Sequence, residues 1–127
     1  MAQMIQRGSE LIRINTQKNT IEYSKDGGRN WHSRCLGSNA GIYVDLFNLG
    51  AEILACTSKG IYYSKDDGRT WHTRCISTSY GSFIQLASDG QNILATTSKG
   101  LYYSKDSGRT WHRRQNIKQL WLHITKS

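Results

Sequence analysis

The residues best suited to chemistry recur in this chain at intervals of 40. In each of three copies of one segment, a histidine follows a tryptophan directly and lies six residues after an aspartate; the pairs are Asp26 and His32, Asp66 and His72, and Asp106 and His112. Carboxylates and imidazoles can bind metals or transfer protons. However, one carboxylate per copy falls short of the roughly 6–8 oxygen ligands that calcium takes, and histidines on three separate repeats cannot converge. We expect neither a metal nor a cofactor.

The three cysteines, Cys35, Cys56 and Cys75, show no sign of a nucleophile or of a disulfide framework. An odd number cannot pair completely within one chain. The first seven residues lack the apolar core of a secretory signal, so we expect reduced thiols and a cytoplasmic protein. The longest apolar runs, such as 53–56, are far shorter than the roughly 20 residues of a membrane helix. We expect no membrane partner.

The chain has 127 residues and a mass of 14.5 kDa. This length supports one hydrophobic core and excludes a large multidomain enzyme. Seventeen Lys and Arg residues against nine Asp and Glu residues give a net charge of +8, which permits binding to a polyanion without establishing it. The chain has no proline. This absence suits a sheet, because proline removes a hydrogen bond from the strand ladder.

The repeat reads as short strands separated by turns. Residues 50–75 and 90–115 are identical at 19 of 26 positions, and residues 21–35 and 61–75 at 11 of 15. Runs rich in Ile, Tyr, Thr, Trp and Leu, bounded by Gly, Ser, Asn and Asp, indicate strands. In the order of a full repeat, we expect first strands at 42–47 and 82–87, second strands at 11–15, 53–57 and 93–97, third strands at 20–24, 60–64 and 100–104, and fourth strands at 30–35, 70–75 and 110–115. Four short strands per 40 residues predict an all-β protein built of four-stranded antiparallel β-propeller blades.

The turn between the third and fourth strands has the pattern Ser-x-Asp-x-Gly-x-Thr-Trp. The aspartate can accept backbone N–H groups, the glycine can adopt a positive φ, and the tryptophan supplies a large apolar body between blades. This pattern resembles the Asp-box, or BNR repeat, of sialidases, sortilin-type receptors, some glycoside hydrolases and photosystem assembly factors. The second and third copies match it in full, whereas the first has Asn30 in place of threonine.

The resemblance implies a propeller of the sialidase-like superfamily. In that family the Asp-box lies on the outer rim, opposite the ligand site, and its role is structural. By resemblance, the following residues are therefore fold determinants and not catalysts: Ser24, Asp26, Gly28, Trp31, Ser64, Asp66, Gly68, Thr70, Trp71, Ser104, Asp106, Gly108, Thr110 and Trp111.

The repeats begin and end out of phase. The first repeat starts at a second strand, and the chain ends with residues 120–125, which resemble the first strands at 42–47 and 82–87. The aligned triplets are Tyr43/Phe83/Trp121, Val44/Ile84/Leu122 and Leu46/Leu86/Ile124. We expect the C-terminal strand to complete the first blade, either of its own chain or of a partner, because an unpaired strand edge promotes aggregation.

Three blades are too few for a closed ring, because propellers have about 4–8. Two chains supply six, so we predict a homodimer with two-fold symmetry. Each chain is then a single half-propeller domain over residues 1–127, with repeats at about 10–47, 50–87 and 90–125.

The first strands should line the axis of the ring, and the repeats diverge there. Asp45, Gln85 and His123 are equivalent polar positions. Arg13 stands where the other repeats have alanine, and it could pair with Asp45 or reach an anionic ligand. The candidate ligand-binding residues are Arg13, Tyr43, Asp45, Tyr80, Gln85, Trp121 and His123. The simpler interpretations are a solvated channel lining and, for the loops 37–41 and 77–81, ordinary connections.

These features favour a non-enzymatic binding or scaffold propeller, with lectin-like binding of a glycan or anionic ligand at the axis or the loops. One alternative is a sialidase-like glycoside hydrolase, which by resemblance needs an arginine triad, a Tyr–Glu pair and an acid/base aspartate. Near-identical blades offer few residues for such an asymmetric centre. The other alternative is polyanion or nucleic-acid binding through the repeated positions Lys25/Lys65/Lys105, Arg29/Arg69/Arg109 and Arg34/Arg74/Arg113.

Overall fold

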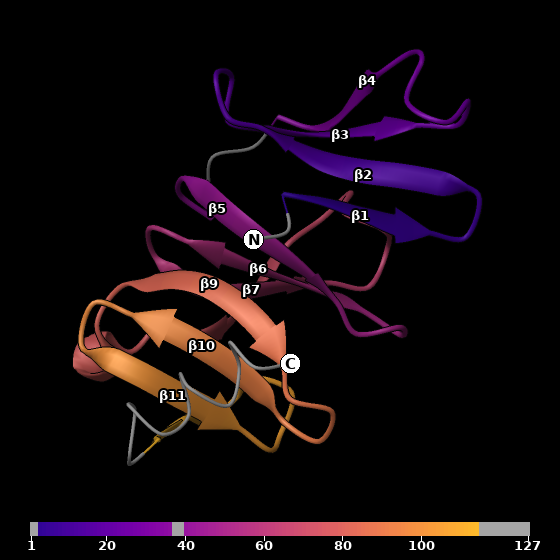
Figure 1. The fold of residues 1–127 in the computed structure, drawn as a ribbon. Helices are drawn as coiled ribbons and strands as arrows, with labels where there is room; N and C mark the ends of the chain where they lie inside the picture. Colours follow the sequence, from indigo (N-terminus) through magenta and orange to yellow (C-terminus); the bar gives the residue numbers. More distant parts are fainter. Residues whose placement is uncertain (1–2, 37–39, 115–127) are drawn as a thin grey trace.

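The computed structural model describes residues 3–36 and 40–114, which form three sheets of four antiparallel strands (Figure 1). We name the sheets blades 1, 2 and 3 in chain order. Blade 1 contains β1 (Met4–Arg7), β2 (Glu10–Asn15), β3 (Thr20–Ser24) and β4 (His32–Cys35); blade 2 contains β5 (Tyr43–Asn48), β6 (Ile53–Thr57), β7 (Gly60–Ser64) and β8 (His72–Cys75); blade 3 contains β9 (Phe83–Ser88), β10 (Ile93–Thr97), β11 (Gly100–Ser104) and β12 (His112–Arg113). A 3-10 turn, η1 (Thr78–Tyr80), precedes β9.

Each blade is a meander in which neighbouring strands pair in chain order. The expected second and third strands agree closely with β2, β3, β6, β7, β10 and β11. The fourth strands begin two residues later than expected, at His32, His72 and His112. The delay follows from the turns, which hold the two residues before each histidine in hydrogen bonds of their own.

The prediction that blade 1 lacks a first strand is wrong. β1 pairs with β2, placing Met4 opposite Arg13 and Arg7 opposite Glu10, so the N-terminal segment completes its own blade. The C-terminal strand expected at 120–125 lies outside the described residues, and the role assigned to it in blade 1 is already filled by β1. The segment that forms β1 has only four residues, of which only Ile5 is buried, so it does not show the apolar pattern of its counterparts.

The hydrophobic cores lie in the two seams where neighbouring blades face each other. Successive residues of a strand point to opposite sides of a sheet, so a blade packs against each neighbouring blade with a different face. The core between blades 1 and 2 contains Ile12, Ile14, Ile21, Ile53, Ala55 and Tyr62. The core between blades 2 and 3 contains Leu54, Cys56, Ile61, Ile93, Ala95 and Tyr102. Blade 2 therefore has two buried faces, and every residue of β6 is buried.

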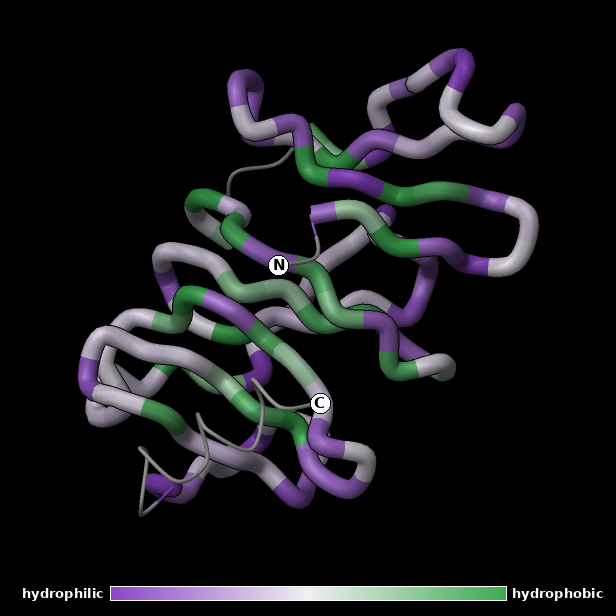
Figure 2. The backbone as a smooth tube through the Cα atoms, in the orientation of Figure 1, coloured by the Kyte–Doolittle hydropathy of each residue, from purple (hydrophilic) through white to green (hydrophobic). Residues whose placement is uncertain are grey.

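The strands β1, β5 and β9 lie side by side along one edge of the row of blades (Figure 1). We call them the inner strands. Figure 2 shows hydrophobic backbone along the strands and hydrophilic backbone in many of the turns at their ends. Among the described residues no helix reaches even a quarter of the length needed to cross a bilayer.

Candidate functional site

In each Asp-box turn, one aspartate carboxylate accepts three hydrogen bonds from other residues of the turn. In blade 2 the Ser64 hydroxyl donates to Asp66 Oδ1 at 2.7 Å, and the Thr70 N–H donates to the same oxygen at 2.9 Å. The Thr70 hydroxyl donates to Oδ2 at 2.5 Å. The Gly68 N–H donates to Ser64 Oγ at 2.8 Å, and the Trp71 indole N–H donates to the Gly68 carbonyl at 3.0 Å. The turn of blade 3 repeats this pattern. The turn of blade 1 repeats it with the Asn30 side-chain amide in place of the threonine hydroxyl.

These bonds hold the Asp-box carboxylates ionised. The Asn30 N–H and the Ser24 hydroxyl lower the pKa of Asp26 to about 2. Burial acts to raise the pKa of Asp66 and Asp106, but the hydrogen bonds from the threonine side chain and backbone outweigh it and lower each pKa to about 2. A general acid needs the opposite shift. All three carboxylates are therefore held as hydrogen-bond acceptors within their turns.

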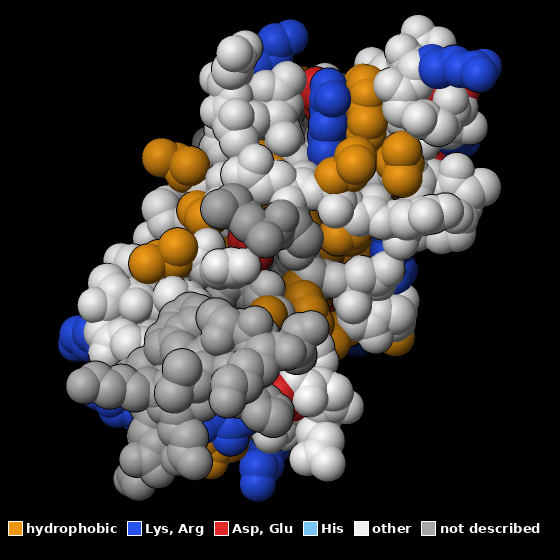
Figure 3. All heavy atoms as spheres, viewed as in Figure 1, with side chains coloured by type: hydrophobic (Ala, Val, Ile, Leu, Met, Phe, Trp, Pro, Cys, Tyr) orange, Lys and Arg blue, Asp and Glu red, His pale blue; other side chains and the backbone are white. Residues whose placement is uncertain are grey.

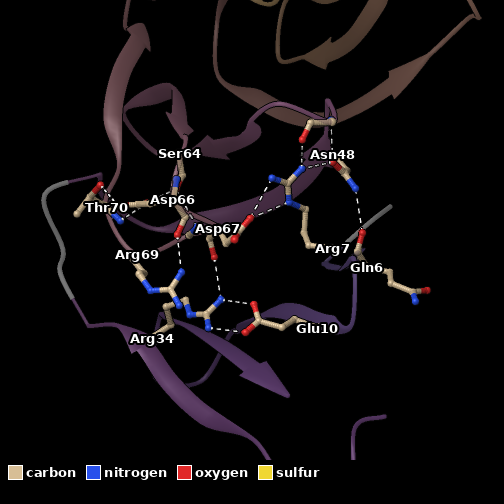
Figure 4. Close-up of polar contacts among 12 residues, drawn as sticks. Gln6, Arg7, Glu10, Arg34, Asn48, Ser64, Asp66, Asp67, Arg69 and Thr70 are labelled. Carbon is tan, nitrogen blue, oxygen red and sulfur yellow. Dashed lines mark hydrogen bonds and ion pairs between the residues drawn. The ribbon is translucent and has the colours of Figure 1, made fainter. Parts of the chain in front are cut away.

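A buried arginine joins the Asp-box turn of blade 2 to blade 1 (Figure 4). Arg34 forms a two-pronged ion pair with Glu10 at 2.7 and 2.9 Å, lies over the Tyr23 ring at 3.9 Å, and donates to the Asp67 carbonyl of blade 2 at 3.2 Å. Its side chain is only 3% exposed. The hydrogen bond from Arg34 lowers the pKa of Glu10. In this way one guanidinium ties two strands of a blade to the following turn.

The next seam repeats this arrangement. Arg74 pairs with Glu52, lies over the Tyr63 ring at 4.2 Å, and donates to the Ser107 carbonyl of blade 3 at 3.0 Å. Asp67 and Ser107 have φ angles of 62° and 64°, a region that is costly for residues other than glycine. The accepting carbonyls therefore belong to left-handed turn residues in both seams.

Arg7 adds a second connection at the seam between blades 1 and 2 (Figure 4). Its guanidinium donates to Asp67 Oδ1 at 2.9 Å, to Asn48 Oδ1 at 2.8 Å and to the Gly50 carbonyl. The Asn48 amide donates in turn to the Gln6 carbonyl at 2.9 Å. This network lines a shallow depression at the rim and uses its polar groups for contacts within the chain.

The repeated basic positions expected to bind a polyanion need a correction in the set Arg34/Arg74/Arg113. The repeat equivalent of Arg34 and Arg74 is Arg114 and not Arg113, because Arg114 lies over the Tyr103 ring at 4.8 Å. Arg114 pairs with Asp89 at 2.7 Å. Arg34 and Arg74 are buried in the seams, so they are closed to a polyanion.

Every carboxylate of the chain lies within the described residues and is bound by a donor of the protein. Arg7, Arg13, Arg34 and Arg74 bind one carboxylate each, the three Asp-box aspartates are held in their turns, and backbone N–H groups bind the other two. The nine carboxylates are Glu10, Glu22, Asp26, Asp45, Glu52, Asp66, Asp67, Asp89 and Asp106. Each of the nine side chains therefore already has a hydrogen-bond or ion-pair partner within the chain.

Arg13 lies on the side of blade 1 that faces away from blade 2, which we call the outward face of blade 1. It pairs with Glu22 at 2.8 Å and lies over the Trp31 ring at 3.9 Å. Asn15 also donates to Glu22, at 3.1 Å. The expected pairing of Arg13 with Asp45 is therefore wrong, because the carboxylate opposite Arg13 on β3 is Glu22.

Asp45 and Tyr43 are buried in the interior. Asp45 is 0% exposed and its Oδ2 accepts the Leu86 N–H of blade 3 at 2.9 Å. Tyr43 packs against Trp71, with ring centroids 5.8 Å apart, and burial raises the pKa of its hydroxyl. Burial, reinforced by the Asp45 charge, also raises the pKa of the Cys56 thiol. The structure closes both candidates to solvent.

The other candidates do not converge on one site with Arg13. Tyr80 follows blade 2 and packs edge-on against Tyr102, with centroids 5.4 Å apart. Gln85 lies on β9, where its role as a ligand contact stays a prediction. Trp121 and His123 lie outside the described residues.

A groove of about 170 Å³ opens between blades 2 and 3 at the end of the sheets opposite the Asp-box turns. We call this end the loop face. The groove is lined by small hydroxyl residues, glycines, one lysine and two apolar side chains: Thr57, Ser58, Lys59, Gly60, Ile76, Ser77, Thr78, Gly81, Ser82, Phe83 and Ser98. Ser98 Oγ accepts the Ser82 N–H at 2.9 Å, which ties the start of β9 to the turn after β10 on the blade 3 side of the groove.

Apolar side chains stand exposed on the loop face, a feature that sequence reasoning missed. Leu36 and Ile76 follow the fourth strands of blades 1 and 2 at equivalent positions and are 71% and 56% exposed; Ile42, just before β5, is 62% exposed. Figure 3 shows apolar side chains protruding at the edge where β5 and β9 begin. Leu36 and Ile76 share the 40-residue spacing, which could have indicated them.

The described residues contain no cluster of three or more His, Cys, Asp or Glu side chains that could hold a metal ion. Each histidine after an Asp-box tryptophan instead packs against a tyrosine of the neighbouring strand, at centroid distances of 5.4 to 5.5 Å. The three cysteines are free, and two are buried.

Three four-stranded antiparallel sheets, stacked through seams that contain Trp71 and Trp111, define a β-propeller protein. The family model described as BNR/Asp-box repeat matches residues 22–33, 62–73 and 102–113. The chain therefore carries three copies of the BNR/Asp-box repeat. A search of curated proteins found none that matches it.

Solved structures share the fold at low sequence identity. "YCF48 bound to D1 peptide" aligns with a TM-score of 0.67 and 20% identity, covering 91% of this chain and 41% of that one. YCF48 from Cyanidioschyzon merolae aligns at 0.64 with 23% identity, covering 87% and 39%. The GH74 enzyme of Niastella koreensis aligns at 0.57 with 16% identity, covering 89% and 18%. The chain thus spans about two fifths of the YCF48 chains.

The Asp-box geometry predicts how stability depends on pH. Each Asp-box carboxylate has a pKa near 2 in the folded chain against about 3.9 when unfolded. Its stabilising contribution is therefore present above about pH 4 and is lost as the pH falls toward 2. We expect Asp66→Asn to lower the free energy of unfolding by about 1–3 kcal/mol at pH 7. Urea unfolding from pH 7 to pH 2 should show this deficit shrinking below pH 4, and a deficit that persists unchanged at pH 2 would contradict the assignment.

Proposed function

We propose that this chain is a non-enzymatic propeller module that binds an extended segment of another protein on its loop face, in the groove between blades 2 and 3. The observation that carries this proposal is the pairing of that groove with an exposed apolar side chain, Ile76, at its edge. An apolar anchor beside hydroxyl and backbone groups is the chemistry that holds a peptide.

The positions of the other polar groups support this choice. The Asp-box rim and the seams use their carboxylates and their buried arginines for contacts within the chain, whereas the loop face presents glycines, hydroxyls and exposed apolar residues. The structurally similar YCF48 is bound to a peptide in one solved structure. With a chain charge of +8, we expect the bound segment to carry acidic residues beside an apolar anchor.

We favour a binding function over glycoside hydrolysis because the carboxylates already form hydrogen bonds and ion pairs within the chain. Hydrolysis needs two carboxyl groups flanking one bond, one of them with a raised pKa. The ion pairs and hydrogen bonds described above instead lower the pKa values of Glu10, Glu52 and the Asp-box aspartates. The similar GH74 enzyme shares the fold alone.

The groove can be tested with a displayed library of linear 12-residue peptides, screened beside a glycan array. We expect selection of peptides with an apolar residue next to Asp or Glu. Ile76→Glu should weaken the selected peptides at least tenfold, because it places a charge at the apolar edge of the groove. Leu36→Glu is the matched control, since it changes the equivalent exposed position outside the groove and should leave binding intact. Equal loss in both variants, or enrichment of glycans alone, would refute the peptide groove.

The homodimeric six-bladed ring expected from the blade count stays a prediction about assembly. In such a ring, the outward face of blade 1 in one chain would contact the side of blade 3 that faces away from blade 2 in the other chain. Light scattering should then give about twice the chain mass of 14.5 kDa. A mass of one chain at micromolar concentration would exclude the ring and leave the loop-face groove unaffected.

A further inference from the structure

The side of blade 3 that faces away from blade 2 carries buried apolar residues that belong to neither described core. Leu94 and Leu101 are 5% and 4% exposed, but the two seam cores do not include them. By strand register, Leu94 is equivalent to Ile12 and Leu54, and Leu101 to Ile21 and Ile61. These are the residues on which a following blade packs. This side, which we call the outward face of blade 3, thus has the apolar residues that in blades 1 and 2 pack against a following blade.

In both complete seams, the inner strand of the following blade covers these positions. Tyr43 and Leu46 of β5 are part of the first core, and Phe83 and Leu86 of β9 are part of the second. The Asp-box tryptophan of the following blade packs beside them, with Phe83 and Trp111 centroids 5.4 Å apart. An inner strand with a bulky ring and an aliphatic residue three positions later is therefore the common cover.

A polar contact also joins each inner strand to the next. Gln3, just before β1, donates to the Val44 carbonyl at 3.3 Å, and Asp45 on β5 accepts the Leu86 N–H at 2.9 Å. Gln85 holds the equivalent place on β9, because it lies opposite Thr96 as Asp45 lies opposite Cys56. Gln85 is therefore placed to bind the backbone of a further inner strand.

We propose that residues 120–125, which lie outside the described residues, dock on the outward face of blade 3 as the inner strand of an incomplete fourth blade. The sequence supplies the required spacing, because Trp121 and Ile124 align with Tyr43 and Leu46 and with Phe83 and Leu86. In sequence, five residues separate position 115, the equivalent of Cys35 and Cys75, from Trp121, whereas seven residues separate Cys35 from Tyr43 and Cys75 from Phe83. This assignment replaces the role in blade 1 that β1 already fills.

The outward face of blade 1 argues against a second copy as the cover. Blade 2 packs against the preceding blade with the pair Ala55 and Tyr62, and blade 3 does so with Ala95 and Tyr102. The equivalent pair on blade 1 is Arg13 and Glu22. A polar outer face is typical of the terminal repeat of an array. Docking it on Leu94 and Leu101 would bury an ion pair against apolar side chains, which is unfavourable.

The full-length chain can test this proposal through one pair of variants. Trp121→Gln should lower the melting temperature by about 5 °C or more and should expose the Leu94 and Leu101 methyl groups to a soluble paramagnetic relaxation agent in methyl NMR spectra. Leu122→Gln is the matched control, because its counterpart Ile84 is 43% exposed and its counterpart Val44 is only partly buried; it should lower the melting temperature less and leave the two leucines protected.

The remaining outcomes are decisive against the proposal. If both variants keep the two leucines protected, another part of the molecule covers them. If protection is lost on diluting the unmodified chain while the mass falls from two chains to one, a second copy is the cover. Neither result bears on peptide binding at the loop face, so the two proposals fail separately.

Discussion

The structure depends on a guanidinium held between blades. A single four-stranded sheet cannot bury both of its faces, so each blade is stable only against a neighbour. Arg34 and Arg74 fix that neighbour in place: each is 3% exposed, paired with a glutamate of its own blade and bonded to a turn carbonyl of the next. Since a buried charge is costly unless fully paired, the glutamate, the tyrosine ring and the carbonyl must all be in place together.

This constraint gives the Asp-box turn two roles. Within a blade, the aspartate organises the loop between the third and fourth strands. Between blades, the same turn presents a carbonyl to the arginine and a tryptophan to the core. Gly68 shows how tightly the two roles are joined: its φ is 93°, and a Cβ there would lie 3.2 Å from Cγ2 of Ile21 in blade 1. The turn therefore cannot vary independently of the seam, which leaves the opposite end of the blades to diverge.

The repeat made most of the fold predictable from sequence. Its 40-residue period and alternating residues located the second and third strands closely, and the Ser-x-Asp-x-Gly-x-Thr-Trp spacing predicted the turns. β1 was missed because Met4–Arg7 pairs through its backbone and offers only Ile5 to the core. Such a strand is determined by its partner β2, and its own composition gives little signal.

The candidate site was less predictable, because it depends on contacts between repeats. The sequence identified Asp45 as a departure from its equivalents, but only the structure shows its carboxylate at the Leu86 N–H of the next blade. A one-residue irregularity in the pairing of β5 with β6, between Tyr43 and Asp45, accompanies this orientation. Likewise, the exposure of Leu36 and Ile76 follows from the ends of β4 and β8, which no local pattern specifies.

The most direct test compares one substitution at three equivalent positions: Arg34→Gln, Arg74→Gln and Arg114→Gln, each measured by urea unfolding at pH 7. Losses of about 3–5 kcal/mol are expected for Arg34 and Arg74, because each change leaves a glutamate that is only 15% or 12% exposed without its partner. A loss of about 1 kcal/mol is expected for Arg114, whose side chain is 29% exposed. Equal losses at all three positions, or negligible loss at Arg34 and Arg74, would contradict this expectation.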